Sequence, residues 1–159
     1  MDKTEKATFA AGCFWGVEAA FRRTRGVRST LVGYTDGATE NPDYKAVCTG
    51  RTGHAEAVEV EFDPDEISYE ELLEVFWDEH NPTQRNRQGF DIGTQYRSAI
   101  FTHGPGQTAQ AIASRDKVQG RYRKQVVTEI DPASHFYSAE DYHQRYLEKR
   151  GMAVCAIPK

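Results

Sequence analysis

The fold is decided by the stretch AVEVEFDP, which occupies residues 57–64. Apolar and acidic side chains alternate over residues 58–62, which is the pattern of a strand with one core face and one solvated face. Asp63-Pro64 ends that strand. Ser68 and Glu71 then form a capping box, which predicts a helix with an apolar inner face. A strand followed closely by a capped helix is therefore the centre of the predicted fold.

The segments on either side of this pair extend the pattern. An apolar run, a helix-spaced segment that stops before Gly26 and a β-branched run precede it, and a further apolar run follows it. The predicted strands are 7–10, 27–34, 57–62 and 96–101, and the predicted helices are 15–23 and the one that begins at Ser68. The order β-α-β-β-α-β predicts an α+β fold, the ferredoxin-like split β-α-β arrangement in a two-layer α/β sandwich.

The C-terminal third is expected to add to this sandwich. We predict a helix around residues 107–119, a strand at 126–130 and an extra C-terminal helix after Ser138, where Asp141 gives a weaker capping signal. Residues 151–159 begin with glycine and carry a proline near their end, which predicts a mobile C-terminal tail. Two connections, 33–53 and 80–93, are too long to be simple turns, and their aromatic and charged residues favour a functional role.

Composition narrows the class of protein. The chain has 159 residues, 38% of them hydrophobic, and a formal net charge of −4, which argues against disorder and against a main role in binding nucleic-acid phosphates. No run approaches the ~20 apolar residues of a membrane span, and no repeat or linker divides the chain. We therefore expect one domain over residues 1–159. The apolar run before Cys13 is too short for a secretory signal, so we expect a cytoplasmic protein.

The three cysteines, Cys13, Cys48 and Cys155, lie far apart, without the spacing of a zinc site or a Cys-x-x-Cys redox motif. We interpret Cys48 as a small buried residue. A cysteine in a mobile tail, such as Cys155, fits a scheme in which one thiolate reacts and a second resolves the product as a disulfide. The alternative is that the tail cysteine has no role.

Cys13 lies between Gly12 and Gly16, at a predicted strand-to-helix junction. The N–H groups and the dipole at a helix start stabilise an anion. An ordinary thiol is only about 3% thiolate near neutral pH, so such stabilisation matters for reactivity. Phe14 and Trp15 follow directly and would wall an apolar pocket. The alternative is that all three side chains are core residues around a turn.

Glu56 falls on the core-facing register when the alternation of residues 58–62 is continued towards the N-terminus. Burial disfavours a charged carboxylate, so its pKa would rise towards the range of a general acid. If the strand instead begins at Ala57, Glu56 is solvated at its mouth. Tyr44 and Tyr96 lie beside the long loops, and their hydroxyls can donate a hydrogen bond at neutral pH. Each is otherwise a residue at the core edge.

Other catalytic signatures are missing from the sequence. The five histidines show no metal spacing, and we interpret them as structural or surface residues. There is also no phosphate-binding loop and no dinucleotide fingerprint.

Several segments together resemble the type A peptide-methionine sulfoxide reductases over nearly the whole chain. The matching segments are GCFWG at 12–16, GY at 33–34, NPDY at 41–44, GHAEAV at 53–58, NRQG at 86–89 and D-x-G-x-QYRS at 91–98. Their order and separations make the likeness specific, which a lone Cys-Phe-Trp would not be.

The resemblance implies that Cys13 is the nucleophile that attacks the sulfoxide sulfur, and that Glu56 protonates the departing oxygen. Cys13 would become a sulfenic acid, which a second thiol converts to a disulfide. The resemblance also implies supporting residues: Tyr44 and Tyr96 beside the oxygen, Phe14 and Trp15 around the substrate's methyl group, and Asp91 at the polar rim.

The resemblance implies a substrate and a reductant as well. They are the S-epimer of methionine sulfoxide, free or in proteins, and thioredoxin. We expect no metal, flavin or nucleotide cofactor, no nucleic-acid or membrane partner, and a monomer. Many family members end in a longer glycine-rich tail, whereas this chain ends soon after Cys155. Cys155 is the expected resolving residue, and Cys48 or an outside thiol is the alternative.

Two other activities remain open from the residues alone. A thiolate at a helix start also suits a cysteine acyl-transfer enzyme, which would need a histidine base. The aromatic pair Phe14 and Trp15 would equally suit a peptide-binding module without catalysis.

Overall fold

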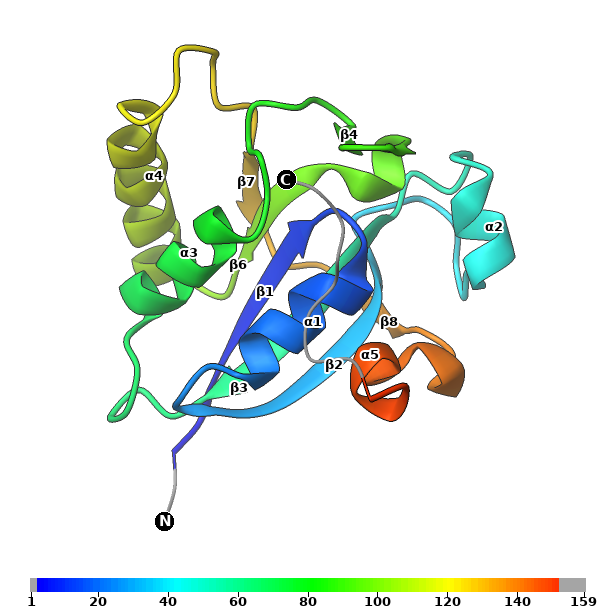
Figure 1. Cartoon of the computed structure of the whole chain (residues 1–159), viewed down its shortest axis with the longest axis horizontal. Coiled ribbons are helices and arrows are strands. Elements are labelled where there is room, and N and C mark those ends of the chain that lie inside the picture. The colour runs from blue at the N-terminus through cyan, green and yellow to red at the C-terminus, as the bar shows by residue number, and fades with distance from the viewer. Residues whose placement is uncertain (1–2, 152–159) are drawn as a thin grey trace.

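A six-stranded sheet forms the centre of the computed structural model, which describes residues 3–151 (Figure 1). The sheet has the order β7-β6-β1-β3-β2-β8. Its strands are β1 (Glu5–Ala11), β2 (Val27–Thr35), β3 (Ala55–Phe62), β6 (Ser98–Thr102), β7 (Glu129–Pro132) and β8 (Phe136–Ser138), and a separate hairpin is made of β4 (Arg87–Gln88) and β5 (Asp91–Ile92). The helices are α1 (Phe14–Arg22), α2 (Tyr44–Cys48), α3 (Tyr69–Asp78), α4 (Pro105–Gln119) and α5 (Tyr146–Lys149), with 3₁₀ helices at Thr94–Tyr96 (η1) and Asp141–His143 (η2).

The four inner strands have the arrangement that the sequence predicts. Neighbours in the order β6-β1-β3-β2 are all antiparallel, and α1 and α3 lie over the same face of the sheet (Figure 1). The ferredoxin-like α+β prediction is therefore confirmed. β7 extends the sheet in parallel beside β6, and β8 extends it in antiparallel fashion beside β2.

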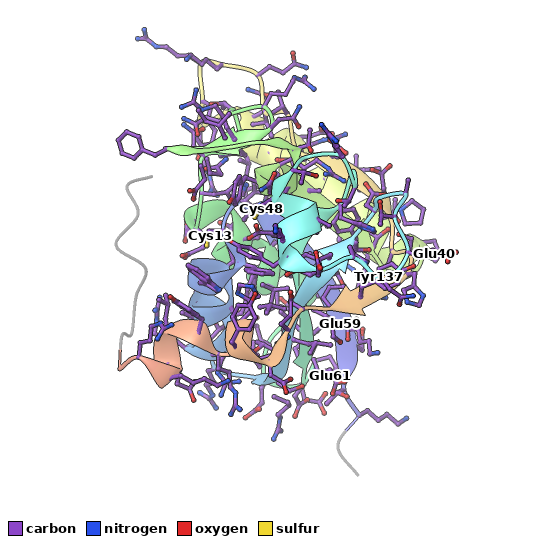
Figure 2. All side chains as sticks on the ribbon, turned by 90° about the vertical axis from the view of Figure 1, so that its right-hand side faces the viewer. Cys13, Glu40, Cys48, Glu59, Glu61 and Tyr137 are labelled. Atoms are coloured by element: carbon purple, nitrogen blue, oxygen red, sulfur yellow. The ribbon has the colours of Figure 1, made fainter. Side chains whose placement is uncertain are left out.

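The core lies between the sheet and the helices α1 and α3. Phe9 of β1 stacks on Phe21 of α1 and on Phe76 of α3, with ring centroids 5.0 and 5.3 Å apart. The inward residues of β3 are fully buried, whereas Glu59 and Glu61 are only partly buried (Figure 2). The alternation predicted for this strand is thus confirmed, and β3 begins two residues earlier than Ala57.

The helix predicted after this strand is confirmed together with its cap. The Ser68 side chain accepts the Glu71 N–H, and the Glu71 carboxylate accepts the Ser68 N–H, each at 3.1 Å. This reciprocal pair satisfies two N–H groups that a helix start otherwise leaves without partners.

Two predicted strands start later than expected. The strand predicted at 96–101 begins at Ser98, because Tyr96 closes η1 instead. The strand predicted at 126–130 runs over Glu129–Pro132. The first residues of the predicted strand make hydrogen bonds outside the sheet: the Val126 N–H donates to the Gln119 side chain, and the Val127 N–H donates to the Pro82 carbonyl. These competing partners, which the local pattern does not reveal, keep both residues out of the ladder.

The helix predicted after Ser138 is replaced by η2 and the short α5. Arg145 lies between them in the left-handed region at φ 52°, which breaks any continuous helix. The capping signal of Ser138 with Asp141 is wrong, since Glu140 holds the N-cap position of η2 and makes no side-chain capping bond. The long connections also hold elements that were not predicted, α2 in 33–53 and the β4–β5 hairpin in 80–93.

The predicted mobile tail begins at Gly151, and the rest of it, with Cys155, lies outside the described residues. Within residues 3–151, no helix combines the length and the apolar character that crossing a membrane requires.

Candidate functional site

Cys13 occupies the N-cap position of α1, directly after the turn that follows β1. Gly12 makes this turn possible because its φ of 94° lies in the left-handed region. A Cβ atom at Gly12 would also come within 2.9 Å of the Gln88 side chain on β4. The Cys13 thiol makes no capping hydrogen bond, and no acidic residue occupies the first turn of α1. The helix dipole can therefore act on the sulfur without a competing negative charge in that turn.

Glu56 lies on β3, is 1% exposed, and its Oε1 accepts the N–H of Phe14 at 3.4 Å. The first N–H of α1 thus links the carboxyl group to the residue next to Cys13. Burial raises the pKa of Glu56 to about 8, with the Phe14 bond opposing and the negative Asp91 adding to the rise. The carboxyl is therefore mostly protonated at neutral pH. Glu56 Oε2 is buried without a hydrogen-bond partner among the described residues, so it is the oxygen that can hold the proton.

Tyr44 and Tyr96 approach Glu56 from two other elements. Tyr44 is the first residue of α2, and Tyr96 is the last residue of η1. Burial is the main cause that raises the pKa of both phenols above the ordinary range. For Tyr44 a hydrogen bond with Cys48 comes next, and the negative charge of Glu56 adds to the rise for both tyrosines. Both hydroxyls consequently stay protonated and can donate hydrogen bonds. Tyr96 also lies within electrostatic range of Cys13, which brings the predicted nucleophile and the predicted proton donors into one cluster.

Asp91 joins this cluster from the β4–β5 hairpin. It is the register partner of Gln88, the residue whose side chain covers Gly12. Partial burial raises the pKa of Asp91, and the Asp91 charge in turn raises the pKa values of Glu56 and Tyr96. The hairpin therefore places a carboxyl group beside the acid on β3.

The two aromatic residues after Cys13 have different surroundings. Phe14 is 1% exposed and packs against Tyr34 and His143, at centroid distances of 5.8 and 5.2 Å. Trp15 is half-buried, stacks on Tyr146 at 3.7 Å, and donates its Nε1–H to His143 Nδ1 at 2.9 Å. Phe14 is thus part of the core behind the cluster, and Trp15 is the more accessible ring.

The buried position expected for Cys48 is wrong. Cys48 is the last residue of α2 and is exposed; Figure 2 labels it together with Cys13. Partial burial of the thiol raises the pKa of Cys48, and hydrogen bonds with Tyr44 and Gln95 oppose the rise. Tyr96 lies within electrostatic range of both cysteines. The short helix α2 explains the error, since its only buried residue is Val47.

Sequence reasoning missed three polar or aromatic residues that border the cluster. They are Tyr34 on β2, Glu140 after β8 and His143 in η2. His143 is 1% exposed, and its ring lies 4.3 Å from the ring of Tyr44. Tyr34 belongs to the matching segment GY at 33–34, and the signal for Glu140 and His143 is the polar and aromatic run at 140–143. No local sequence pattern predicts where residues 140–143 lie in the fold. They reach the site because β8, which precedes them, pairs with β2.

Within residues 3–151, one group of acidic side chains could hold a metal ion, Asp36, Glu129 and Asp131. Arg97 forms ion pairs with the first two, at 3.1 and 3.7 Å. The guanidinium already compensates much of the negative charge that would attract a cation.

Comparison with known proteins shows the family to which the chain belongs. The family described as peptide methionine sulfoxide reductase matches residues 5–159. The chain belongs to the peptide methionine sulfoxide reductase family. The enzyme named peptide methionine sulfoxide reductase MsrA from Methanoculleus marisnigri is 58% identical over 153 residues, covering 95% of this chain and 93% of the relative.

Solved structures agree with the family. The reduced form of Mxr1 from Saccharomyces cerevisiae matches with a TM-score of 0.92 and 36% identity, covering 98% of this chain and 90% of that one. Mxr1 in complex with Trx2 matches with a TM-score of 0.66 and 25% identity, over 91% of this chain and 85% of that one. The chain is accordingly an oxidoreductase that acts on peptide methionine sulfoxide, and of the three activities left open by the residues it is the reductase.

Proposed function

We propose that this chain reduces the S-epimer of methionine sulfoxide, free and in proteins, by thiol catalysis at Cys13. The observation that carries the mechanism is the buried carboxyl of Glu56, with Oε2 unpartnered among the described residues and Oε1 bound to the N–H beside Cys13. Such a site offers a nucleophile and an acid to the two ends of one S–O bond. The biological role would be repair of oxidised proteins.

In the proposed first step, the Cys13 thiolate attacks the sulfoxide sulfur while Glu56 Oε2 gives its proton to the sulfoxide oxygen. Tyr44 and Tyr96 donate hydrogen bonds to that oxygen, Trp15 and Phe14 hold the methyl group, and Asp91 lies at the polar rim. The bond formed between the two sulfurs then breaks as the protonated oxygen moves to the Cys13 sulfur, so that Cys13 becomes a sulfenic acid and methionine leaves as the thioether. Cys13 is oxidised by two electrons and the substrate is reduced by two.

In the second step, a thiol attacks the sulfenic acid, forming a disulfide and releasing water. Cys155 is the resolving residue of the proposal. Its reach supports this role: Tyr146 stacks on Trp15, and the nine residues from there to Cys155 span at most ~30 Å. Cys48 is the alternative, supported by its place near Tyr96. Thioredoxin then reduces the disulfide, as the complex of Mxr1 with Trx2 supports.

The deciding experiment is a single turnover without external reductant. Reduced protein is mixed with a methionine sulfoxide peptide of defined sulfur configuration, and the methionine formed per enzyme is measured. We expect the wild type and Cys48→Ser to reduce the S-epimer in this first turnover and Cys13→Ser to reduce none. Methionine formation by Cys13→Ser, or equal reduction of both epimers, would contradict the proposal.

A further inference from the structure

The helix α2 carries two residues of the site but cannot hold its own position. It has five residues, well below the length at which a helix is stable in isolation. Tyr44 begins it and Cys48 ends it, and Asp43 caps it by accepting the Ala46 N–H at 2.8 Å. Val47 is its only buried residue, and the Tyr44 ring packs on the ring of His143 with centroids 4.3 Å apart. With so little apolar packing, polar contacts with the rest of the protein are needed to complete the orientation of α2.

Glu140 makes the contact that ties α2 to the sheet. One carboxylate oxygen accepts the Tyr44 N–H at 2.9 Å, and the other accepts the Tyr34 hydroxyl at 2.8 Å. Tyr34 is the register partner of Glu56 in the β2–β3 ladder. A continuous route thus runs from the strand that holds Glu56, through Tyr34 and Glu140, to the backbone of Tyr44.

The segment that carries Glu140 is itself firmly attached to β2. The preceding strand β8 pairs with Gly33–Thr35, and the Ala139 N–H donates to the Val32 carbonyl at 2.9 Å. The Gln144 side chain bonds both the N–H and the carbonyl of Val32 at 2.9 Å. Glu140 therefore has a fixed base on the sheet, and α2 is the element that it anchors.

We propose that Glu140 is a positioning residue, which fixes α2 so that the Tyr44 hydroxyl lies beside Glu56. The inference rests on the proposed function of Tyr44 as a hydrogen-bond donor to the substrate oxygen. Glu140 suits the task because a carboxylate can accept two bonds on two oxygens at once. Burial opposes its ionisation, but the Tyr44 and Tyr34 bonds outweigh this and lower the pKa of Glu140, so both oxygens remain acceptors.

The first test compares Glu140→Gln with and without the Tyr44 hydroxyl. Glutamine has one acceptor oxygen, so it cannot take both bonds in the same way. We expect the first-turnover rate of Glu140→Gln to fall roughly tenfold to a hundredfold, as misplacement of a reacting group does. In a Tyr44→Phe background, the same substitution should cost about twofold or less, because the group being positioned is already gone.

The second test does not depend on activity. Amide hydrogen exchange in a peptide covering residues 41–50 should become about tenfold faster in Glu140→Gln, whereas exchange in β3 should not change. Glu74→Gln is the matched control: this carboxylate on α3 pairs with Arg121 on the surface, 3.2 Å away. It should leave both the first-turnover rate and the exchange of residues 41–50 at the wild-type level.

The assignment is overturned by an equal loss of rate in both backgrounds, by unchanged exchange in 41–50, or by faster exchange in β3 as well. The last result would make Glu140 a support of the whole fold. The proposed function fails separately, if the wild type forms no methionine or if Tyr44→Phe retains the full rate. In either case, the exchange measurement still decides whether Glu140 anchors α2.

Discussion

Glu56 is the residue whose chemistry is changed most by where the chain places it. On the surface it would be a carboxylate, but on the inner face of β3 its pKa rises to about 8. The sequence indicated the direction of this effect, because the alternation in residues 57–64 extends to Glu56. It left open whether the strand includes that position. The ladder settles the register, since Glu56 pairs with Tyr34 and β3 begins at Ala55.

The pH dependence of the first turnover should report the protonation of Glu56. Because only the protonated carboxyl can donate, the rate should fall as the pH rises through about 8. In Glu56→Gln this alkaline decline should disappear, and the rate should be roughly 10²–10⁴-fold lower. Rapid-quench measurement of methionine across this pH range checks the prediction. Glu59→Gln, on the outer face of the same strand, is the control that keeps the decline. A decline that survives in Glu56→Gln contradicts the assignment.

The substitution Glu56→Gln should also make the protein more stable. Burial favours the protonated form of Glu56. Its contribution to the stability of the folded state is therefore greatest at a pH below its ordinary pKa of 4.5, and this contribution is lost as the pH rises towards 8. Glutamine keeps the oxygen that binds Phe14 and cannot ionise. We therefore expect Glu56→Gln to raise the free energy of unfolding near pH 8 by roughly 2–4 kcal/mol.

Urea unfolding at several pH values measures this difference. The advantage of Glu56→Gln over the wild type should shrink as the pH falls to about 4 or below, where both side chains are neutral. Glu59→Gln should show no comparable gain. An advantage that does not depend on pH would mean that packing, and not ionisation, is responsible.

At the scale of elements, prediction from sequence succeeded where the signal is local. The capping box at Ser68 and the alternation in β3 depend only on neighbours along the chain, and both are present in the structure. The helix α2 and the strand β8 were missed because distant contacts hold them. β8 requires Gly33, where a Cβ atom would come within 2.3 Å of the Tyr137 carbonyl.

The turn from β1 into α1 offers a matched pair of glycine substitutions. Gly12→Ala forces a side chain onto φ 94° and into Gln88, so we expect a loss of about 1–3 kcal/mol in unfolding free energy and a lower first-turnover rate. Gly106 is the second residue of α4, with nothing within 4 Å of its Cβ position. Gly106→Ala should therefore stabilise by about 0.5–1 kcal/mol and leave the rate unchanged. Equal effects of both substitutions in urea unfolding would refute this account of the turn.

At the scale of the whole molecule, the candidate site depends on long-range topology. Cys13 follows β1, Glu56 is on β3, Tyr44 begins α2 in the connection 33–53, and Tyr96 ends η1, directly after the connection 80–93. Composition and local pattern identified each residue type, and the resemblance to a family gave the residues their roles. The physical reason that they meet is the strand order β6-β1-β3-β2, which the β-α-β-β-α-β pattern predicted. Glu140 and His143 depend on β8 and therefore escaped prediction.

The proposed resolving step involves the chain as a whole, since it would join Cys13 at the start of α1 to Cys155 in the C-terminal segment. We expect Cys155→Ser to keep a normal first turnover and to lose thioredoxin-dependent turnover, because its sulfenic acid has no resolving partner. Cys48→Ser should keep both. Peptide mapping of the wild type after one turnover should find Cys13 joined to Cys155. A Cys13–Cys48 disulfide, or full thioredoxin-dependent turnover by Cys155→Ser, would reassign the step.

The stacking of Trp15 on Tyr146 has a practical consequence for following the reaction by tryptophan fluorescence. The protein has two tryptophans, and the other, Trp77, is 2% exposed and donates to Ser114 of α4 at 2.8 Å. Its fluorescence is therefore a steady background. Any change in indole emission when a sulfoxide arrives can be assigned to Trp15, so the protein carries its own optical reporter and needs no attached dye.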